Sequence, residues 1–400
     1  MEPTYDAIVV GARCAGAPTA TLLAEAGHRV LLVDKATFPS DTVSTLLIHA
    51  PAVAALRRWG VLDDVVATGC PAIETYRFDF GPLVLHGSCQ PVDGSSTAYA
   101  PRRYLLDEIL VNAAIAAGVE VRTGFSVDEL LVDDGVVTGI RGRDADGAEV
   151  TETATIVVGA DGRASKVARA VGAEEYEIKP MLQSGFYTYF EDLPVSGFET
   201  YIRPDRGFAA IPTNDGRTLV VVGWPAAEYA DFKTDPEGNF MATLELAPEF
   251  AEKAKKATRV DRFTAAAVPN VFRVPHGPGW ALVGDAGCTM DPITAAGMRD
   301  AFLDAELWSA AISAGLAGDM ETSLKQAHAE RDAYLLPRYA FTTDLATLSP
   351  PPPEQLQLLM AAAGNQEATD GFVSLVAGVL TPMDYFAPEN VEKILANASA

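Results

Sequence analysis

The sequence predicts an α/β protein that combines a parallel sheet, a second, mixed sheet and a helical C-terminal segment. Short apolar segments run into glycine-rich turns and are followed by helical patterns, which is typical of βαβ units. Four strand-like segments lie between residues 181 and 225. The tail, residues 349–400, is expected to be helical, and so is the segment at residues 240–257.

The composition indicates a protein with a large core. Its 400 residues, 48% of them hydrophobic, suffice for two or three structural units. No apolar run reaches the roughly 18 residues of a membrane span, and the N-terminus lacks the basic start of a signal peptide. The four cysteines show no C-x-x-C spacing, so we expect no metal site, no disulfide framework and a cytoplasmic location.

The charge balance is strongly acidic. Thirty basic and 54 acidic side chains give a formal net charge of −24, which repels nucleic acid over most of the surface. The charges are dispersed, so they indicate a solvated surface rather than an interaction tail. We expect a small organic molecule as partner; a homodimer is compatible with the sequence.

The first turn has the context of a dinucleotide site. A buried strand at residues 5–10, a helix at 16–26 and a second strand at 28–34 form a βαβ unit. The turn departs from G-x-G-x-x-G, because Arg13 stands where the second glycine belongs. A plain strand–turn–helix without a ligand is the alternative.

Individual residues of this unit favour a nucleotide. Gly11 permits the tight turn, and Gly16 lets helix and strand pack closely. Asp34 follows 23 residues after Gly11, at the strand tip where an acidic residue accepts hydrogen bonds from a ribose. The helix N-terminus near residues 14–16 offers free N–H groups to a pyrophosphate.

Two further turns pair glycine with aspartate. A strand at residues 155–158 runs into Asp161-Gly162, and a strand at 281–283 runs into Gly284-Asp285. A helix is expected to open near residues 295–298. Three such turns in this order, each after an apolar strand, are unlike a set of ordinary loops.

In these turns the sequence resembles the flavoprotein monooxygenases of the para-hydroxybenzoate hydroxylase type, with the related geranylgeranyl reductases and flavin-dependent halogenases. The resemblance covers roughly residues 5–345. It implies an interrupted Rossmann-type FAD-binding domain, an inserted mixed-β-sheet substrate domain and a C-terminal helical cap. The expected boundaries are 1–73, 98–178 and 270–345 for the FAD-binding domain, 74–97 and 179–269 for the substrate domain, and 346–400 for the cap.

The resemblance also implies which residues bind FAD. Arg103 would lie near the pyrophosphate or ribityl chain, with Arg102 as the alternative, and Asp285 would hold the ribityl chain. The helix that opens at Gly297 would stabilise negative charge on the reduced flavin. Ala296 is a departure, because many relatives carry Gln or Asn before this glycine. The full set is Gly11, Arg13, Cys14, Ala15, Gly16, Asp34, Lys35, Arg103, Val127, Asp161, Gly162, Gly284, Asp285, Pro292, Ala296, Gly297 and Met298.

The substrate side gives a weaker signal. No catalytic residue is assigned, and an aromatic residue on a strand belongs to a core more often than to a substrate site. A lone histidine is usually structural. The candidates are His49, Tyr187, Tyr201, Arg203 and Trp224.

The resemblance implies an FAD-dependent monooxygenase that hydroxylates a small aromatic or polycyclic substrate with O₂, through a flavin C4a-hydroperoxide. NAD(P)H would be a transient reductant, because only one βαβ dinucleotide site is present and FAD occupies it. The alternatives are a flavin-dependent dehydrogenase or double-bond reductase, a non-catalytic flavin-binding protein and a halogenase. The halogenase is disfavoured because none of the four tryptophans forms a W-x-W pair.

Overall fold

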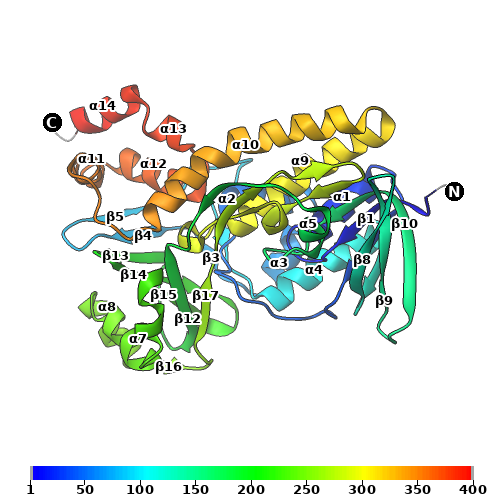
Figure 1. The fold of residues 1–400 in the computed structure, drawn as a ribbon. Coiled ribbons are helices and arrows are strands. Elements are labelled where there is room, and N and C mark those ends of the chain that lie inside the picture. Colours follow the sequence, from blue (N-terminus) through cyan, green and yellow to red (C-terminus); the bar gives the residue numbers. More distant parts are fainter. Residues whose placement is uncertain (1–2, 398–400) are drawn as a thin grey trace.

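The structure, a computed structural model, describes residues 3–397 and places the parallel sheet at one end of the molecule (Figure 1). The strand order is β19-β20-β10-β1-β2-β7, and the β8–β9 hairpin continues from β10. All pairs from β20 to β7 are parallel. The strands are β1 (Tyr5–Val10), β2 (Val30–Asp34), β7 (Glu120–Thr123), β8 (Ser126–Asp133), β9 (Val136–Arg143), β10 (Glu149–Gly159), β19 (His276–Gly277) and β20 (Trp280–Leu282).

Helices cover one face of this sheet. Helix α1 packs against α4 and α9, and α9 packs against α10, which runs along the top of Figure 1. The α/β architecture predicted from the βαβ pattern is confirmed. The helices on this face are α1 (Gly16–Glu25), α2 (Ala50–Arg58), α3 (Leu62–Ala67), α4 (Arg103–Ala116), α9 (Gly297–Ala317) and α10 (Met320–Leu345). The short helix α5 (Lys166–Val171) packs against the opposite face.

The carboxyl ends of β1, β2, β10 and β20 meet at one edge of the sheet, because these strands are parallel neighbours. The three glycine–aspartate turns follow these strands, so the topology gathers them at that edge. Ligands of open α/β sheets bind at such an edge.

The second sheet is mixed, as predicted. Its order is β16-β12-β15-β14-β13-β4-β5, with β17 also paired to β12. Only β13–β4 is parallel among its pairs within the described residues. The strands are β4 (Tyr76–Asp79), β5 (Val84–Gly87), β12 (Gln183–Glu191), β13 (Phe198–Arg203), β14 (Arg206–Pro212), β15 (Arg217–Pro225), β16 (Thr258–Arg259) and β17 (Thr264–Ala267).

The two faces of the second sheet pack against different parts of the chain. One face, here the inner face, lies against Leu46, Leu47 and Ala295. The other, the outer face, lies against helices that follow β15. These helices are α6 (Tyr229–Phe232), α7 (Pro236–Leu244) and α8 (Pro248–Ala254), preceded by the 3₁₀ turn η2 (Ala226–Glu228).

The helical prediction for residues 240–257 needs one correction. The structure has two helices here, because Pro248 begins a second one. Ala247 before it is extended, with φ −128° and ψ 87°, as expected for a residue that precedes proline. Proline fits the first turn of a helix, where its missing N–H costs nothing.

Smaller elements complete the fold. The tail is helical, as predicted, and α11 and α12 pack against β5 (Figure 1). The remaining elements are α11 (Pro353–Ala363), α12 (Gln366–Ala377), α13 (Pro382–Tyr385), α14 (Pro388–Asn397), β3 (Ala72–Ile73), β6 (Ala98–Tyr99), β11 (Glu175–Lys179), β18 (Asn270–Arg273), β21 (Cys288–Thr289), η1 (Asn214–Gly216), η3 (Gly284–Ala286) and η4 (Pro292–Thr294).

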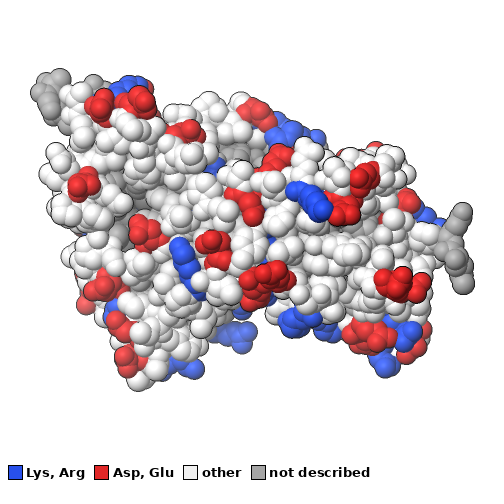
Figure 2. Space-filling model, turned by 45° about the horizontal axis from the view of Figure 1, so that its top comes forward, with Lys and Arg blue, Asp and Glu red and all other residues white. Residues whose placement is uncertain are grey.

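The surface matches the dispersed charge pattern. Figure 2 shows acidic side chains spread over one face among scattered basic ones. Within residues 3–397 no helix is long and apolar enough to cross a membrane.

Candidate functional site

The first glycine turn packs tightly against the end of β10. Gly11 has φ +104°, in the region that favours glycine. A Cβ at Gly11 would overlap the carbonyl of Ala160, and a Cβ at Gly16 would overlap the carbonyl oxygen of Gly11. Both glycines are therefore required by the backbone, whereas the position of Arg13 accepts a side chain.

Asp34 is joined to this turn. Its carboxylate accepts hydrogen bonds from the N–H of Ala12 at 2.7 Å and of Ala36 at 2.8 Å. The carboxylate therefore stands beside the turn, where the second strand ends. The neighbouring Lys35 is exposed.

Arg13 reaches across to α4. Its Nη1 pairs with Asp107 at 2.5 Å, and its Nη2 donates to Ser40 Oγ at 2.8 Å. Arg103 binds the same carboxylate, with contacts of 2.9–3.1 Å. Cys14 donates its S–H to Asp107, and burial raises the pKa of this thiol to about 12. Asp107, fully buried, thus holds the turn and α4 together.

Arg102 and Arg103 point to different surroundings. Arg102 pairs with Asp41 at 2.7 Å and its guanidinium lies 4.2 Å from the ring centre of Tyr189, on the second sheet. Arg103 belongs to the first turn through Asp107. This placement favours Arg103 as the residue nearer the dinucleotide turn.

The second turn begins a helix. Asp161 Oδ2 accepts the N–H groups of Lys166 and Val167 at 2.6 and 3.3 Å, which orders the start of α5. Its Oδ1 is buried with no hydrogen-bond partner among the described residues. The Val127 carbonyl accepts from Lys166 Nζ at 2.9 Å. Gly162 has φ +77°.

The third turn places Asp285 beside open space. Asp285 is solvent-accessible although Gly284 and Ala286 on either side are buried. The surrounding protein nevertheless raises its pKa, against the opposing charges of Arg103 and Arg163. A carboxylate that is enclosed by protein yet accessible to solvent fits a ligand recess. A Cβ at Gly284 would lie 2.8 Å from the Cβ of Ala15 in the first turn.

The start of α9 is open as well. Gly297 is exposed between the buried residues Ala296 and Met298, and a Cβ there would meet nothing within 4 Å. Just before it, Ala295 has φ +52°, a left-handed conformation that is unusual for alanine. The first N–H groups of a helix lack intrahelical acceptors and carry partial positive charge. The N-terminus of α9 can therefore stabilise negative charge on the edge of a bound ring.

These features fit FAD. Asp34 would bind the adenosine ribose, the turn at residues 11–16 the pyrophosphate, and Asp285 the ribityl hydroxyls. Gly297, with Pro292 in the half-buried η4 turn before it, would face the flavin ring. Within the described residues no cluster of His, Cys, Asp or Glu could hold a metal ion.

Four of the five substrate-side candidates lie on the second sheet and separate into two groups. Tyr187 lies on the inner face, and its buried hydroxyl has no hydrogen-bond partner among residues 3–397. Tyr201 and Trp224 lie on the outer face, among residues of α6–α8. Arg203 pairs with Asp79 at 3.0 Å and donates to backbone carbonyls. The structure thus separates these three from Ala295 and the turns.

His49 has both ring nitrogens engaged. Nε2–H donates to the Thr294 carbonyl at 3.0 Å, which leaves Nδ1 to accept from the Tyr76 hydroxyl at 3.1 Å. Burial, with the charge of Arg299, lowers its pKa to about 3, so the ring is neutral at physiological pH. His49 holds the loop before α9 in place, and neither nitrogen is free for a substrate.

Sequence reasoning missed Asp291, which precedes Pro292. Its Oδ1 accepts from the Gln183 amide on β12 and from the N–H of Ile293 at 3.0 Å. Its Oδ2 is buried without a hydrogen-bond partner in the described part of the chain, and burial raises its pKa to about 6. The sequence signal was the Asp-Pro pair itself, but burial by the second sheet could not be read from it.

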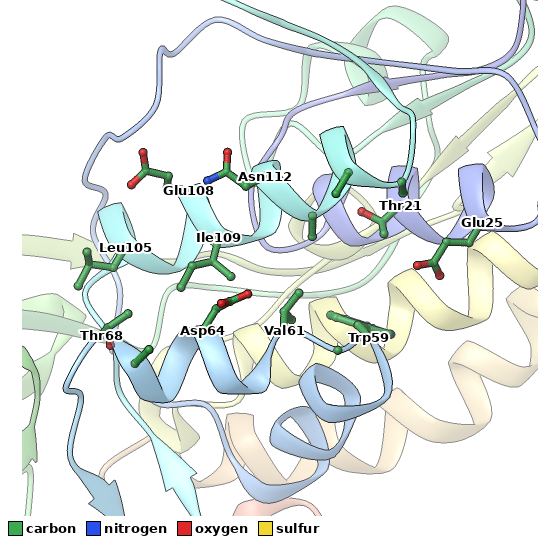
Figure 3. A pocket seen from close by; sticks show the side chains of 15 residues that line it. Thr21, Glu25, Trp59, Val61, Asp64, Thr68, Leu105, Glu108, Ile109 and Asn112 are labelled. Atoms are coloured by element: carbon green, nitrogen blue, oxygen red, sulfur yellow. The ribbon is translucent and has the colours of Figure 1, made fainter.

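A recess of about 710 Å³ lies elsewhere on the surface (Figure 3). It opens between α3 on one side and α1 and α4 on the other. Its lining includes Trp59, Val61 and Ile109 with the acids Glu25, Asp64 and Glu108, and none of the residues expected to bind FAD. We therefore do not assign the flavin to it.

Together the parallel sheet, its three glycine–aspartate turns and the open helix start define a dinucleotide-binding flavoprotein. The model of the family described as FAD binding domain matches residues 4–335, and the chain belongs to this family.

The names of two relatives describe different activities, one a reductase and the other a monooxygenase. The digeranylgeranylglycerophospholipid reductase of Methanosarcina mazei is 28% identical over 336 residues, 79% of this chain and 77% of the relative. The 6-methylpretetramide 4-monooxygenase of Streptomyces rimosus is 26% identical over 335 residues, 75% and 73% of the two chains.

Solved structures share the fold. A flavoprotein/dehydrogenase from Cytophaga hutchinsonii has a TM-score of 0.83 at 19% identity, with 98% of both chains covered. The myxobacterial chondrochloren halogenase has a TM-score of 0.77 at 24% identity, covering 98% of this chain and 96% of that one. The family and the two named relatives make the protein an enzyme, an FAD-dependent oxidoreductase, rather than a non-catalytic flavin-binding protein.

Removing the carboxylate that Arg13 and Arg103 share should destabilise the protein. We expect Asp107→Ala to lower the free energy of unfolding by about 3–5 kcal/mol, because two guanidinium groups lose their counter-charge. Urea denaturation measures this loss. As control, Asp93→Asn removes the exposed charge that pairs with Arg58, keeps a residue suited to the left-handed backbone at this position (φ +46°) and should change stability by less than about 1 kcal/mol. Equal losses in both variants would contradict the central role of Asp107.

Asp34→Ala should weaken FAD binding by about 10- to 100-fold, the effect of losing a charged hydrogen bond worth about 1.5–3 kcal/mol. Fluorescence titration of apoprotein with FAD measures it. Asp34→Asn, which keeps an acceptor oxygen, should lose less. An Asp34→Ala protein that binds FAD like the parent would refute the ribose assignment.

Asp304 should make stability depend on pH. It is fully enclosed, accepts the N–H of Gly284 at 3.0 Å, and burial raises its pKa to about 7. In unfolded chains this pKa is about 3.9. The folded state thus binds the extra proton, and stability falls as the pH rises from about 4 to 7.

Asp304→Asn keeps the acceptor for Gly284 but does not titrate. Its unfolding free energy, followed by urea denaturation across this pH window, should fall less than that of the parent. Parallel curves for parent and variant would show that Asp304 does not titrate there.

Proposed function

We propose that the protein is an NAD(P)H-dependent monooxygenase that hydroxylates a small aromatic or polycyclic organic substrate. The observation that carries this proposal is the buried, unpartnered hydroxyl of Tyr187 on the inner face of the second sheet. It lies in the same apolar cluster as Ala295, which immediately precedes the open start of α9. A polar group of a ring substrate would satisfy this hydroxyl.

The inner face suits a planar aromatic molecule. Tyr76, Phe78, Tyr187 and Tyr189 belong to the cluster that covers it. Aromatic side chains give large apolar contacts and edge-to-face packing to ring ligands. A substrate held here would be shielded from water, which limits side reactions.

The residues of the chain bind and orient rather than perform the oxidation. FAD, when bound, supplies the transfer of electrons to O₂ and of one oxygen atom to the substrate. The N-terminus of α9 offers N–H donors to negative charge, and His49 fixes the Thr294 carbonyl in the adjoining loop. Burial raises the pKa of Asp291 to about 6, so its unpartnered Oδ2 belongs to a mostly ionised carboxylate at neutral pH and can take up a proton as the pH falls toward 6.

NAD(P)H would bind only transiently. The one βαβ turn of the dinucleotide type among residues 3–397 would be taken by FAD, so the nicotinamide would need an open approach. We place this approach near Asp161 and Arg163. Arg163 is exposed and donates to the Ala267 carbonyl at the second sheet, at 3.2 Å.

A second candidate is a flavin-dependent double-bond reductase. The observation that favours it is the likeness to digeranylgeranylglycerophospholipid reductases. The 6-methylpretetramide 4-monooxygenase supports the first candidate. The cytoplasmic location and a homodimer remain predictions.

Substrate should accelerate NAD(P)H oxidation, and the product should contain one atom from O₂. In the balanced hydroxylation, a substrate C–H group, O₂, NAD(P)H and a proton are converted to a C–OH group, water and NAD(P)⁺. The measurement is turnover of candidate aromatic substrates under ¹⁸O₂ with mass analysis. Unlabelled product that has gained two hydrogens would establish the reductase, and one that has lost two hydrogens a dehydrogenase.

Tyr187→Phe should lower kcat/KM by about 2- to 10-fold, the effect of one neutral hydrogen bond worth about 0.5–1.5 kcal/mol. FAD content and the flavin absorption spectrum should not change. Tyr201→Phe is the matched control, because this tyrosine lies on the outer face and bonds to Glu199. Steady-state kinetics of both variants measure the difference. Similar kinetics in both would remove Tyr187 from the substrate site.

A further inference from the structure

A small cavity beside α9 contains two buried arginines. It measures about 10 Å³ and is lined by Thr294, Arg299, Arg338, Phe341, Thr342, Leu375, Val376 and Pro382. Arg299 is 2% exposed and Arg338 6% exposed. The lining comes from α9, α10, α12, the η4 turn before α9 and the start of α13, and it includes none of the residues expected to bind FAD.

The positive charge around this cavity is not balanced by the described residues. Arg299 is paired with Asp300 at 2.7 Å. Arg338 forms no ion pair among residues 3–397. Its Nη2 donates to the Gly378 carbonyl at 3.0 Å, and its Nε is buried without an acceptor. Two cations therefore share one buried carboxylate.

Other groups compensate Arg338 only in part. The ring of Tyr334 lies 4.4 Å from its guanidinium carbon. Asp384 acts on Arg338 through charge alone, and its carboxylate is exposed and used by Thr381 in the cap of α13. Burial and the charge of Arg299 together lower the pKa of Arg338. An unpaired buried cation is costly unless a counter-charge is supplied.

The backbone makes room for the two guanidinium groups. Gly378 ends α12 in the left-handed conformation, with φ +80°. A Cβ there would overlap the guanidinium of Arg299 and lie 2.8 Å from Nη1 of Arg338. The glycine thus lets both arginines converge on the tail. A cavity of this volume admits about one water-sized sphere, so it excludes a polyatomic ligand and leaves room for a single monatomic group.

We propose that this cavity binds a single small monovalent anion, with chloride as the physiological candidate. Arg338 Nε and the guanidinium of Arg299 would be its donors, and Thr294 and Thr342 complete the polar lining. The anion would connect the loop before α9 to α12 in the tail. This site is independent of the reaction that the enzyme performs.

Bromide is the direct probe. Crystals of the holoenzyme soaked in sodium bromide should show an anomalous peak between Arg299 and Arg338. A peak absent there, with only water density or no density in the cavity, overturns the proposal. This measurement uses the unaltered protein and does not depend on any variant.

Thermal melting of the holoenzyme tests binding in solution. Replacing sodium gluconate by sodium chloride at constant ionic strength should raise the melting temperature to a plateau. Arg338→Met should abolish this rise and, without chloride, melt no lower than the parent, because it removes an uncompensated charge. Arg217→Met, which removes a surface cation paired with Glu191, should keep the full chloride response.

Two results of the melting experiment would contradict the anion site. A parent that melts equally in chloride and gluconate, or an Arg338→Met protein that retains the rise, contradicts the site. If Arg338→Met does not fold, the bromide crystals and the parent's chloride response decide.

Discussion

A single buried carboxylate joins the parts of the nucleotide site. Asp107 receives Arg13 from the first turn and Arg103 from its own helix, and the thiol of Cys14 donates to it as well. The glycine turn is thus anchored to α4 as well as to the sheet. A buried acid with two cations leaves a positive excess, which suits a region where a pyrophosphate is expected. Arg13 replaces the missing glycine of the fingerprint with an electrostatic anchor.

The site then follows from the parallel topology. Because β1, β2, β10 and β20 are neighbours, Asp34, Asp161 and Asp285 come from distant parts of the sequence to one sheet edge. Close contacts fix their separation: Gly11 packs against the backbone carbonyl of Ala160, and Gly284 packs against the methyl group of Ala15. The second sheet adds Tyr187 and, through Gln183, contacts Asp291 beside the start of α9. The sheet edge with the three aspartates and the inner face of the second sheet are therefore both next to the loop that precedes α9.

The fold was predictable because glycine and aspartate mark turns locally. The strands that precede the three turns, four strands of the second sheet and the start of α9 could be placed from such signals. The partner of Arg13 could not, because Asp107 lies 94 residues further along the chain. The alternation of side chains along strands predicts that Tyr187 and Trp224 can point to opposite faces of the sheet. Only the packing of α6–α8 decides which of these faces is the outer one. The proton affinity of Asp291 likewise depends on burial by a strand more than 100 residues away.

Helix α9 makes contacts with both the parallel-sheet end of the fold and the C-terminal helices. Its first turns bury Arg299, Asp300 and Asp304. Asp304 holds the N–H of Gly284 and so the turn that carries Asp285, whereas Arg299 extends to the end of α12 in the tail. Gly297, at the head of the same helix, has no side chain to anchor it, and a Cβ there would meet nothing within 4 Å. Its position is therefore set by charged side chains on either side, which links the C-terminal helices to the geometry offered to the flavin.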